Sequence, residues 1–477
     1  MRQRMSTESE GDAALQGIGI DFGTTNSSVA LYDGERVRYL RLEEVPDGEV
    51  MPTALYLSRD RQAAVGRAAI DRYTRDNAGR TVRLSAEEVG AITVTVAGTD
   101  QSVGLDDGGS ITRSFEVHAW TDQDLPGRLF RSVKRWLGSA TVERVRVFDA
   151  HYRIVALATP VLTAMSEAIA AADAGRGTPF VGRPIHYEGR TSDANQIAVA
   201  RMTEACGHAG LGNARLFPEP IAAATSYLEG NPLRDGETAL AFDFGGGTLD
   251  LSVVESRGRE LALRASHGVP IGGDEIDRRI YRALVFPELG EGARVHRPVV
   301  DEWREEPFPF DRFADRLLNW ALAYDLNRPE LLELLVQGMR EGGDAGRRLE
   351  RLYSVVKANL SYTVFQAIER AKLELADADR AEIVVEELDL CVPISGEELD
   401  RIAAPLLDQA AHALDTVLDA AGVKPDALSV VVRTGGSSRL RAVIRLLEAR
   451  FPGRVVEHDP FTSIAAGLAI ASWKSTN

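Results

Sequence analysis

Apolar residues form short continuous runs along the chain, and each run is followed by a polar or glycine-containing turn. Residues 17–34, GIGIDFGTTNSSVALYDG, consist of an apolar run, a polar turn and a second apolar run that ends at the turn signal Asp33-Gly34. Residues 239–255, ALAFDFGGGTLDLSVVE, repeat this plan. The two Asp-Phe-Gly triplets begin at Asp21 and Asp243, 222 residues apart. The pattern therefore predicts two similar lobes, each starting with a hairpin of strands.

The residues between these hairpins predict alternating strands and helices. Thr and Val alternate over 91–98, as in a strand, and helices are expected at 126–138, at 160–172 and in a segment that closes at Gly210. A buried strand is expected at 180–187, and a further strand at 214–217. Pro220 occupies the favoured first turn of a helix that stops at Gly230. Strands that alternate with helices predict the α/β class.

The second half of the chain is expected to be mainly helical over 276–375. Residues 430–453 predict a strand, a glycine turn and an amphipathic helix that ends at Pro452-Gly453, and a short apolar helix finishes the chain. These patterns divide the chain into four parts. We expect a disordered tail at 1–16, lobe I at 17–234 with an insertion at about 51–152, lobe II at 235–456 with an insertion at about 275–395, and a helix at 457–477 that returns to lobe I.

Composition narrows the class of protein. At 477 residues the chain is too long for one core, and its hydrophobic fraction of 44% is typical of soluble globular proteins. The best candidate for a membrane span, 154–165, is interrupted by Thr159 and Pro160. The chain starts without a secretory signal, and Cys206 and Cys391 favour buried free thiols in the cytoplasm. The net charge of −16 argues against a nucleic-acid partner, although a nucleotide in a local pocket remains possible.

Three glycine turns follow predicted strands, at Gly23, at Gly245, Gly246 and Gly247, and at Gly435 and Gly436. Successive backbone N–H groups in such a turn form a concave site for phosphate oxygens, and a helix N-terminus after the third turn adds positive potential. Any one of these turns is explained equally well as an ordinary hairpin or capping turn.

Asp21 and Asp243 occupy equivalent strand ends in the two predicted lobes. If they face each other across a cleft, they suit a hydrated Mg²⁺, which takes few carboxylates and keeps most of its waters. The alternative is that each aspartate caps its own turn.

Lys134 and Glu219 are candidate catalytic residues. The 55 basic residues comprise five lysines and fifty arginines, so a compact ammonium at Lys134 stands out, and it suits a point contact with a γ-phosphate or an attacking water. The alternatives are an exposed position on a basic helix for Lys134, and a favourable interaction of Glu219 with the dipole of its helix.

Glu369 and Lys372 are spaced as a surface ion pair on a helix, and they equally suit contact with ribose hydroxyls. Thr24, Thr25 and Thr248 place hydroxyls beside the glycine turns, which is also ordinary for threonine near strands. The motifs GxxxxGK[ST], HExxH and GxSxG do not occur, and no GxGxxG follows a strand.

Taken together, these segments resemble the ATPase domain of the DnaK-type heat-shock chaperones, within the actin and sugar-kinase superfamily. Two segments are similar to the family's phosphate motifs, and the others to its lysine segment, connecting motif, second-lobe glycine turn and adenosine motif. In this order they are 19–31 (GIDFGTTNSSVAL), 241–254 (AFDFGGGTLDLSVV), 133–138 (VKRWLG), 217–228 (FPEPIAAATSYL), 271–277 (IGGDEID) and 432–440 (VRTGGSSRL). The resemblance implies the actin-like ATPase fold, with two similar ribonuclease-H-like lobes and with helical and β insertions that flank a nucleotide cleft.

The resemblance also implies roles for individual residues. Asp21 and Asp243 would hold Mg²⁺ through water. The attacking water would be surrounded by catalytic residues: Lys134, Glu219, Asp243, Thr248 and Asp250. ATP or ADP would contact Gly23, Thr24, Thr25, Asn26, Gly245, Gly246, Gly247, Gly272, Gly273, Glu369, Lys372, Leu373, Gly435, Gly436, Ser437 and Arg439, the last on one face of adenine. Pro184 matches a proline that the family uses in signalling.

The chain departs from the family pattern at several positions. Leu373 and Ala376 stand where the family has an arginine and a serine on the adenine, Phe461 follows Pro460 in place of an aspartate, and Arg183 replaces a small apolar residue. The chain ends where the family's interdomain linker and peptide-binding domain would begin. It therefore resembles the short, YegD-like branch, with enlarged insertions near 85–119 and 287–357.

The resemblance implies a switch that binds Mg-ATP and hydrolyses it slowly, with a chaperone-like role and protein clients or co-chaperones that the sequence does not identify. No membrane partner is expected. Two alternatives remain open, a small-molecule (sugar) kinase of the same superfold and a nucleotide-dependent scaffold that does not hydrolyse ATP.

Overall fold

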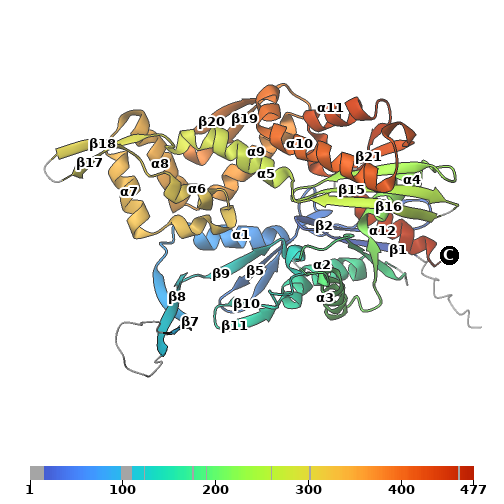
Figure 1. Cartoon of the computed structure of the whole chain (residues 1–477), viewed down its shortest axis with the longest axis horizontal. Helices are drawn as coiled ribbons and strands as arrows, with labels where there is room; N and C mark the ends of the chain where they lie inside the picture. The colour runs from blue at the N-terminus through green and yellow to red at the C-terminus, as the bar shows by residue number, and fades with distance from the viewer. Residues whose placement is uncertain are drawn as a thin grey trace, which may run out of the picture.

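Two β-sheets of the same topology form the centres of two lobes in the computed structural model (Figure 1). The structure describes residues 16–97, 110–122, 124–174, 177–189, 191–258, 260–299, 302–459 and 462–476. In lobe I the strand order is β13-β12-β1-β2-β3, with β4 beside β2. These strands are β1 (Gly17–Phe22), β2 (Asn26–Tyr32), β3 (Val37–Tyr39), β4 (Val50–Pro52), β12 (Pro179–Arg183) and β13 (Arg215–Pro218).

The sheet of lobe II has the strand order β16-β15-β14-β21-β22, which repeats that of lobe I. In both sheets the first two strands form an antiparallel hairpin, and the next strand to join lies parallel to the first. The strands are β14 (Thr238–Phe244), β15 (Leu249–Arg257), β16 (Glu260–Val269), β21 (Val430–Thr434) and β22 (Val455–Glu457). The predicted α/β class with two similar lobes is therefore confirmed.

Helices α4 (Glu219–Leu228) and α12 (Ser463–Lys474) connect the two lobes, and α12 packs against β1. The approach is so close that a Cβ on Gly19 would lie 2.0 Å from the Ala465 carbonyl oxygen, and one on Gly467 would lie 1.7 Å from that of Ala222. Glycine at these positions therefore lets the last helix lie directly on the sheet of lobe I.

The remaining helices of lobe I are α2 (Ile154–Ala171) and α3 (Ala194–His208). Helix α2 starts before Pro160 and is long and apolar enough to cross a membrane by length and composition, whereas the sequence pattern predicts a shorter helix. One face of α2 packs into the core of lobe I, through Ile154, Val155, Leu157, Ala158, Val161, Leu162 and Met165. This burial identifies α2 as a core helix.

The insertion of lobe I contains a small sheet, a helix and two hairpins. Its elements are β5 (Ala54–Ser58), β6 (Ala63–Val65), α1 (Gly66–Asn77), β7 (Leu84–Ala97), β8 (Ser110–Asp122), β9 (Gly127–Arg131), β10 (Arg144–Val147) and β11 (Ala150–Arg153). The prediction of a helix at 126–138 is wrong, because β9 pairs with β5 and only a 3₁₀ turn, η1 (Val133–Trp136), follows it. The strand expected at 91–98 lies within β7, apart from Gly98, which is outside the described residues.

Lobe II carries most of the helices, as predicted, but its insertion also contains a hairpin, β17 (Arg294–Val299) with β18 (Glu302–Pro307), that the helical periodicity does not indicate. The helices and the second hairpin are α5 (Gly273–Ile280), α6 (Asp311–Leu317), η4 (Trp320–Leu326), α7 (Pro329–Met339), α8 (Gly343–Lys357), α9 (Ser361–Glu374), β19 (Arg380–Val385), β20 (Leu390–Ser395), α10 (Gly396–Ala421) and α11 (Arg441–Arg450). Cys206 is buried, but Cys391 in β20 is exposed, so the expectation of two buried thiols is wrong.

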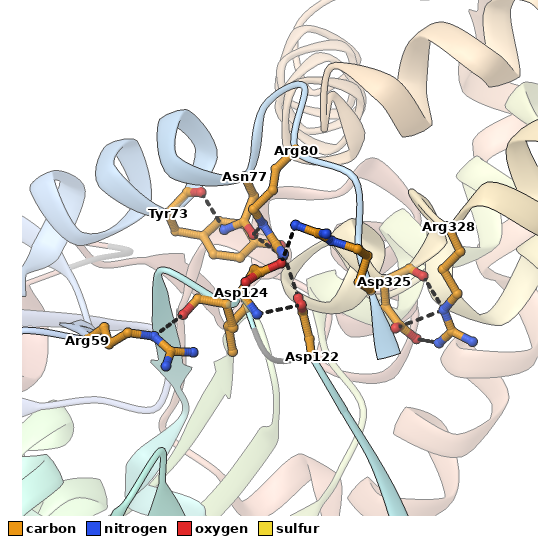
Figure 2. Close-up of polar contacts among 10 residues, drawn as sticks. Arg59, Tyr73, Asn77, Arg80, Asp122, Asp124, Asp325 and Arg328 are labelled. Carbon is orange, nitrogen blue, oxygen red and sulfur yellow. Dashed lines mark hydrogen bonds and ion pairs between the residues drawn. The ribbon is translucent and has the colours of Figure 1, made fainter. Parts of the chain in front are cut away.

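The two insertions contact each other above the cleft, and we call this contact the roof. Its apolar part includes Tyr73 of α1 and Trp320 of η4, and the Tyr73 hydroxyl donates a hydrogen bond to the Trp320 carbonyl oxygen at 2.9 Å. The Val82 N–H also donates to the Asn327 carbonyl oxygen at 2.6 Å. Figure 2 shows Tyr73, Asn77 and Arg80 at the end of α1, close to the Asp325–Arg328 pair of the other insertion.

We expect Tyr73→Phe to lower the free energy of unfolding by about 1 kcal/mol, because the ring stays packed while the Trp320 carbonyl loses its partner. Urea denaturation followed by circular dichroism measures this change. The matched control is Tyr353→Phe, since that hydroxyl makes no hydrogen bond to the described residues. Equal stability of the two variants would contradict a roof that depends on this bond.

Candidate nucleotide site

A cleft of about 1620 Å³ lies between the two lobes and beneath the roof. Thr25 and Asn26 line it from the turn between β1 and β2, and Gly246 and Gly247 line it from the turn between β14 and β15. Its walls also include Gly272, Glu369 and Leu373, together with Ile70 and Trp320 of the roof. The structure thus brings the two predicted phosphate turns to the base of one cleft.

The two turns face each other at close range. A Cβ on Gly246 would lie 3.1 Å from Thr25 Oγ1, and one on Gly247 would lie 3.8 Å from Thr24 Cγ2. The turn at Gly245–Gly247 also rests on the start of α5, where the N–H groups of Gly273 and Asp274 donate to the carbonyl oxygens of Gly245 and Gly246 at 3.0 and 2.8 Å. Side chains on these glycines would fill the space between the turns.

The third glycine turn lies directly behind Asp243. Gly435 has a φ of +82°, and a Cβ there would lie 2.4 Å from the Phe244 carbonyl oxygen and 2.6 Å from Asp243 Oδ1. Ser437 Oγ donates to the Gly245 carbonyl oxygen at 2.9 Å. Gly436–Arg439 forms a 3₁₀ turn, η7, so the expected helix begins only after it. This turn therefore fixes the position of the second phosphate turn.

Lys134 of η1 and Glu219 at the start of α4 form a buried ion pair, with Nζ and Oε1 2.5 Å apart and the two side chains 8% and 16% exposed. Gly182 of β12 lies beneath the carboxylate, since a Cβ there would be 3.0 Å from Glu219 Oε1. Burial lowers the pKa of Lys134, but the carboxylates of Glu219 and Asp21 more than offset it, and the net shift is upward. Lys134 therefore stays charged.

Asp21 and Asp243 lie close enough for their charges to interact. Burial, followed by the charge of Glu219, raises the pKa of Asp21 to about 7. Burial, and then the charges of Asp250, Asp21 and Glu219, raise the pKa of Asp243 to about 8. Asp250 also has a raised pKa because it is buried, and it accepts a hydrogen bond from Thr248 Oγ1 at 2.7 Å.

Four carboxylates thus surround the single ammonium of Lys134, and the excess of negative charge favours a bound cation. The donors are all oxygens, which is the ligand type that Mg²⁺ prefers, and few carboxylates are needed when water completes its shell. The residues present at Asp21 and Asp243 therefore fit Mg²⁺ held through water.

Lys372 has a partner that the sequence analysis missed. Its Nζ lies 2.7 Å from Oδ1 of Asp277 on α5, and both side chains are 10% exposed. The structure shows no pair between Lys372 and Glu369; Glu369 is exposed and lines the cleft. Asp277 is visible in the sequence at the end of 271–277, but its distance from Lys372 along the chain gives no reason to pair the two residues.

Other predicted nucleotide contacts are less close to the cleft. Arg439 Nε lies 3.7 Å from Glu457 Oε1, and neither Arg439 nor the Gly435–Gly436 pair is among the described residues that line the cleft. Leu373 is 41% exposed and lies on the cleft wall. The strand predicted at 180–187 is shorter than expected, because β12 ends at Arg183, before Pro184. Pro460 and Phe461 lie outside the described residues.

Comparison with known proteins gives a consistent result. A family model described as Hsp70 protein matches residues 151–289 and 352–472, more than half of the chain. Chaperone protein DnaK from two strains of Thermus thermophilus is 23% identical over 470 residues, covering 94% of this chain. Chaperone protein DnaK 1 from a Synechococcus strain is 26% identical over 304 residues, covering 61% of this chain and 32% of the relative. The chain spans 60% of the length of the Thermus relatives.

Proposed function

Because the chain belongs to the Hsp70 family, whose ATPase region has the actin-like fold, we propose that it binds Mg-ATP in the cleft and hydrolyses it slowly to ADP and phosphate. The supporting observation is the buried Lys134–Glu219 pair beside two interacting carboxylates, Asp21 and Asp243, at the base of two facing glycine turns. In this function the nucleotide acts as a switch between states of the two lobes.

Phosphoryl transfer depends mainly on positioning and on neutralisation of charge. The turns at Gly23 and at Gly246 and Gly247 allow backbone N–H groups to approach the β- and γ-phosphates closely. The Gly245 N–H instead closes its turn through a hydrogen bond to the Thr248 carbonyl oxygen at 3.0 Å. Thr24 and Thr25 add hydroxyl groups from lobe I. Asp21 and Asp243 would hold Mg²⁺ through water, and the ion would supply neutralisation of the phosphate charge.

The attacking water approaches the γ-phosphate from the other side. Glu219 accepts a hydrogen bond from this water, while the charged Lys134 compensates the negative charge that develops on the phosphoryl group. Thr248 is fixed by its hydrogen bond to Asp250 and contacts the water from lobe II. The attack is therefore guided by residues from both lobes.

Release of phosphate from ATP by the purified chain tests this function. We expect turnover below the usual enzyme range of about 1–10³ s⁻¹, with loss of activity on chelation of Mg²⁺ and in Asp243→Asn. Consumption of ATP only in the presence of a sugar would instead identify a small-molecule kinase. Tight ATP binding in calorimetry without turnover would identify a nucleotide-dependent scaffold.

Membership of the Hsp70 family supports a chaperone-like role in general terms. The Thermus relatives are named chaperone proteins, and this chain spans 60% of their length. We propose that the nucleotide state of the two lobes controls a contact with a protein client or co-chaperone, in the same way that a ligand shifts a two-state equilibrium. This role would be supported by a protein partner that the chain retains to a different extent with ATP than with ADP.

Leu373 offers a test of the adenine pocket. We expect Leu373→Arg to raise ATP affinity a few-fold, about 0.5–1 kcal/mol, because a guanidinium can stack on the base where the aliphatic side chain cannot. Calorimetric titration with ATP measures this. Leu322→Arg is the matched control, since Leu322 is 42% exposed on the cleft wall but belongs to the roof side. An equal gain in both variants would indicate general attraction of the phosphates rather than stacking.

A further inference from the structure

Tyr187 has a buried hydroxyl group with no hydrogen-bond partner among the described residues. The side chain is 6% exposed and belongs to the apolar core of lobe I. A buried hydroxyl without a partner destabilises a fold, and such groups are uncommon unless a water or ligand completes the bond. A phenylalanine would fill the same space without burying an unsatisfied polar group. The hydroxyl is therefore best explained by a water or ligand that binds to it.

The loop that carries Tyr187 is held firmly in place. The Tyr187 N–H donates to Asn195 Oδ1 at 2.6 Å, and Asn195 Nδ2 donates to the Ile185 carbonyl oxygen at 2.9 Å. One side chain at the start of α3 therefore fixes the backbone on both sides of His186. This anchoring limits the movement of the tyrosine ring.

The same loop lies directly on the segment that contains Lys134. Arg135 Nε donates to both carboxylate oxygens of Glu188, at 2.7 and 2.9 Å. The backbones are in close contact as well, because a Cβ on Gly138 would lie 2.4 Å from the Glu188 carbonyl oxygen and one on Gly189 would lie 2.7 Å from that of Gly138. The residues that follow Tyr187 are thus bound to the residues that follow Lys134.

The electrostatics agree with this placement. Burial raises the pKa of Tyr187, the charge of Lys134 opposes the shift and the charge of Glu219 adds to it. The hydroxyl is therefore neutral at physiological pH and lies within the field of the Lys134–Glu219 pair. A neutral phenol can accept and donate one hydrogen bond each.

We propose that Tyr187 is a further catalytic residue, whose hydroxyl binds the attacking water beside the Lys134–Glu219 pair; this rests on the ATP hydrolysis proposed above. The phenol oxygen accepts one O–H of the water and Glu219 accepts the other, which leaves a lone pair of the water directed at the γ-phosphorus. The water oxygen then bonds to phosphorus, the bond from phosphorus to the bridging oxygen breaks, and ADP keeps the electron pair. The proton of the water passes to Glu219, and Tyr187 keeps its own.

Tyr187→Phe tests the proposal, with Tyr281→Phe as matched control. Tyr281 is fully buried in lobe II, and its hydroxyl also has no partner among the described residues. We expect both variants to unfold at a higher temperature than the wild type, because each removes an unsatisfied polar group. Only Tyr187→Phe should lower kcat, by about 10-fold, without a change in the Kd for ATP.

The possible outcomes separate this inference from the proposed function. If the wild type does not hydrolyse ATP, the proposed function and the role of Tyr187 both fail. If the wild type hydrolyses ATP and both variants match its kcat, only the role of Tyr187 fails. A lower unfolding temperature or weaker ATP binding in Tyr187→Phe would show a structural role and would also overturn the inference.

Discussion

Replacement of Lys134 by alanine is expected to lower the rate of ATP hydrolysis about 10²–10³-fold, the loss seen when one preorganised charge-stabilising group is removed from an active site. Lys134 is the ammonium that offsets the carboxylates of Glu219, Asp21 and Asp243. Without it, the developing charge on the γ-phosphoryl group would face these carboxylates without compensation. Binding of ATP should change much less, since the phosphate contacts proposed above are made by backbone groups of the glycine turns.

Single-turnover hydrolysis, measured by acid quenching with the protein in excess over ATP and above the Kd, reports this step separately from product release. Lys134→Arg is an informative companion, because it keeps the charge but replaces a compact ammonium by a planar guanidinium, and we expect it to stay far below the wild type. Lys424→Ala removes one of the other lysines at an exposed position and should leave the rate unchanged. Turnover of Lys134→Ala equal to that of the wild type would remove Lys134 from the mechanism.

Stability must be followed in the same samples. Loss of Lys134 leaves Glu219 buried without its partner at the start of α4, so the free energy of unfolding should also fall. If the variant unfolds at a temperature well above that of the assay, its low rate reflects slow hydrolysis by a folded protein. The comparison of ATP affinity between wild type and variant serves the same purpose, because an unfolded chain cannot bind the nucleotide.

The repeated hairpins show which features the sequence predicts well. In β1–β2 and β14–β15 the apolar runs, the polar turn and the glycines are all local signals, and the same strand order results in both lobes. The closeness of Asp21 and Asp243 agrees with this repeat, since the two residues stand at equivalent strand ends and their charges interact. Local pattern and tertiary structure agree here, which is typical of segments with consistent propensities.

The sequence predictions are wrong or incomplete where contact with a segment distant in the sequence decides the structure. Residues 127–131 form a strand only because β5 pairs with them, and this pairing overrides a segment that looks helical. The same applies to Lys372, whose partner Asp277 lies on another helix, and to Tyr187, whose burial without a partner depends on the loop anchored by Asn195. Burial and ion pairing between distant segments leave little trace in residue spacing, so the sequence alone does not predict them.

Asp277→Ala is expected to have the largest effect on stability, a loss of about 3–5 kcal/mol in the free energy of unfolding. Asp277 and Lys372 are 7% and 9% exposed, and their charged atoms are 2.7 Å apart. Burial raises the pKa of Asp277 to about 6, although the charge of Lys372 opposes the shift. Desolvation thus outweighs attraction at Asp277, and the pair is stable only as long as both partners are present.

Removal of the aspartate leaves a buried ammonium, whereas removal of both charges leaves an apolar contact. We therefore expect the double variant Asp277→Leu/Lys372→Met to recover most of the stability that each single substitution loses, as found for other buried pairs. Urea denaturation of the wild type, Asp277→Ala, Lys372→Met and the double variant measures this recovery. A loss below about 1 kcal/mol in Asp277→Ala, which is typical of exposed pairs, would contradict the buried pair. The pair also lies close to the start of α5. A Cβ on Gly273 would be 3.2 Å from Lys372 Nζ, and the Gly273 N–H donates to the Gly245 carbonyl oxygen in the second phosphate turn at 3.0 Å.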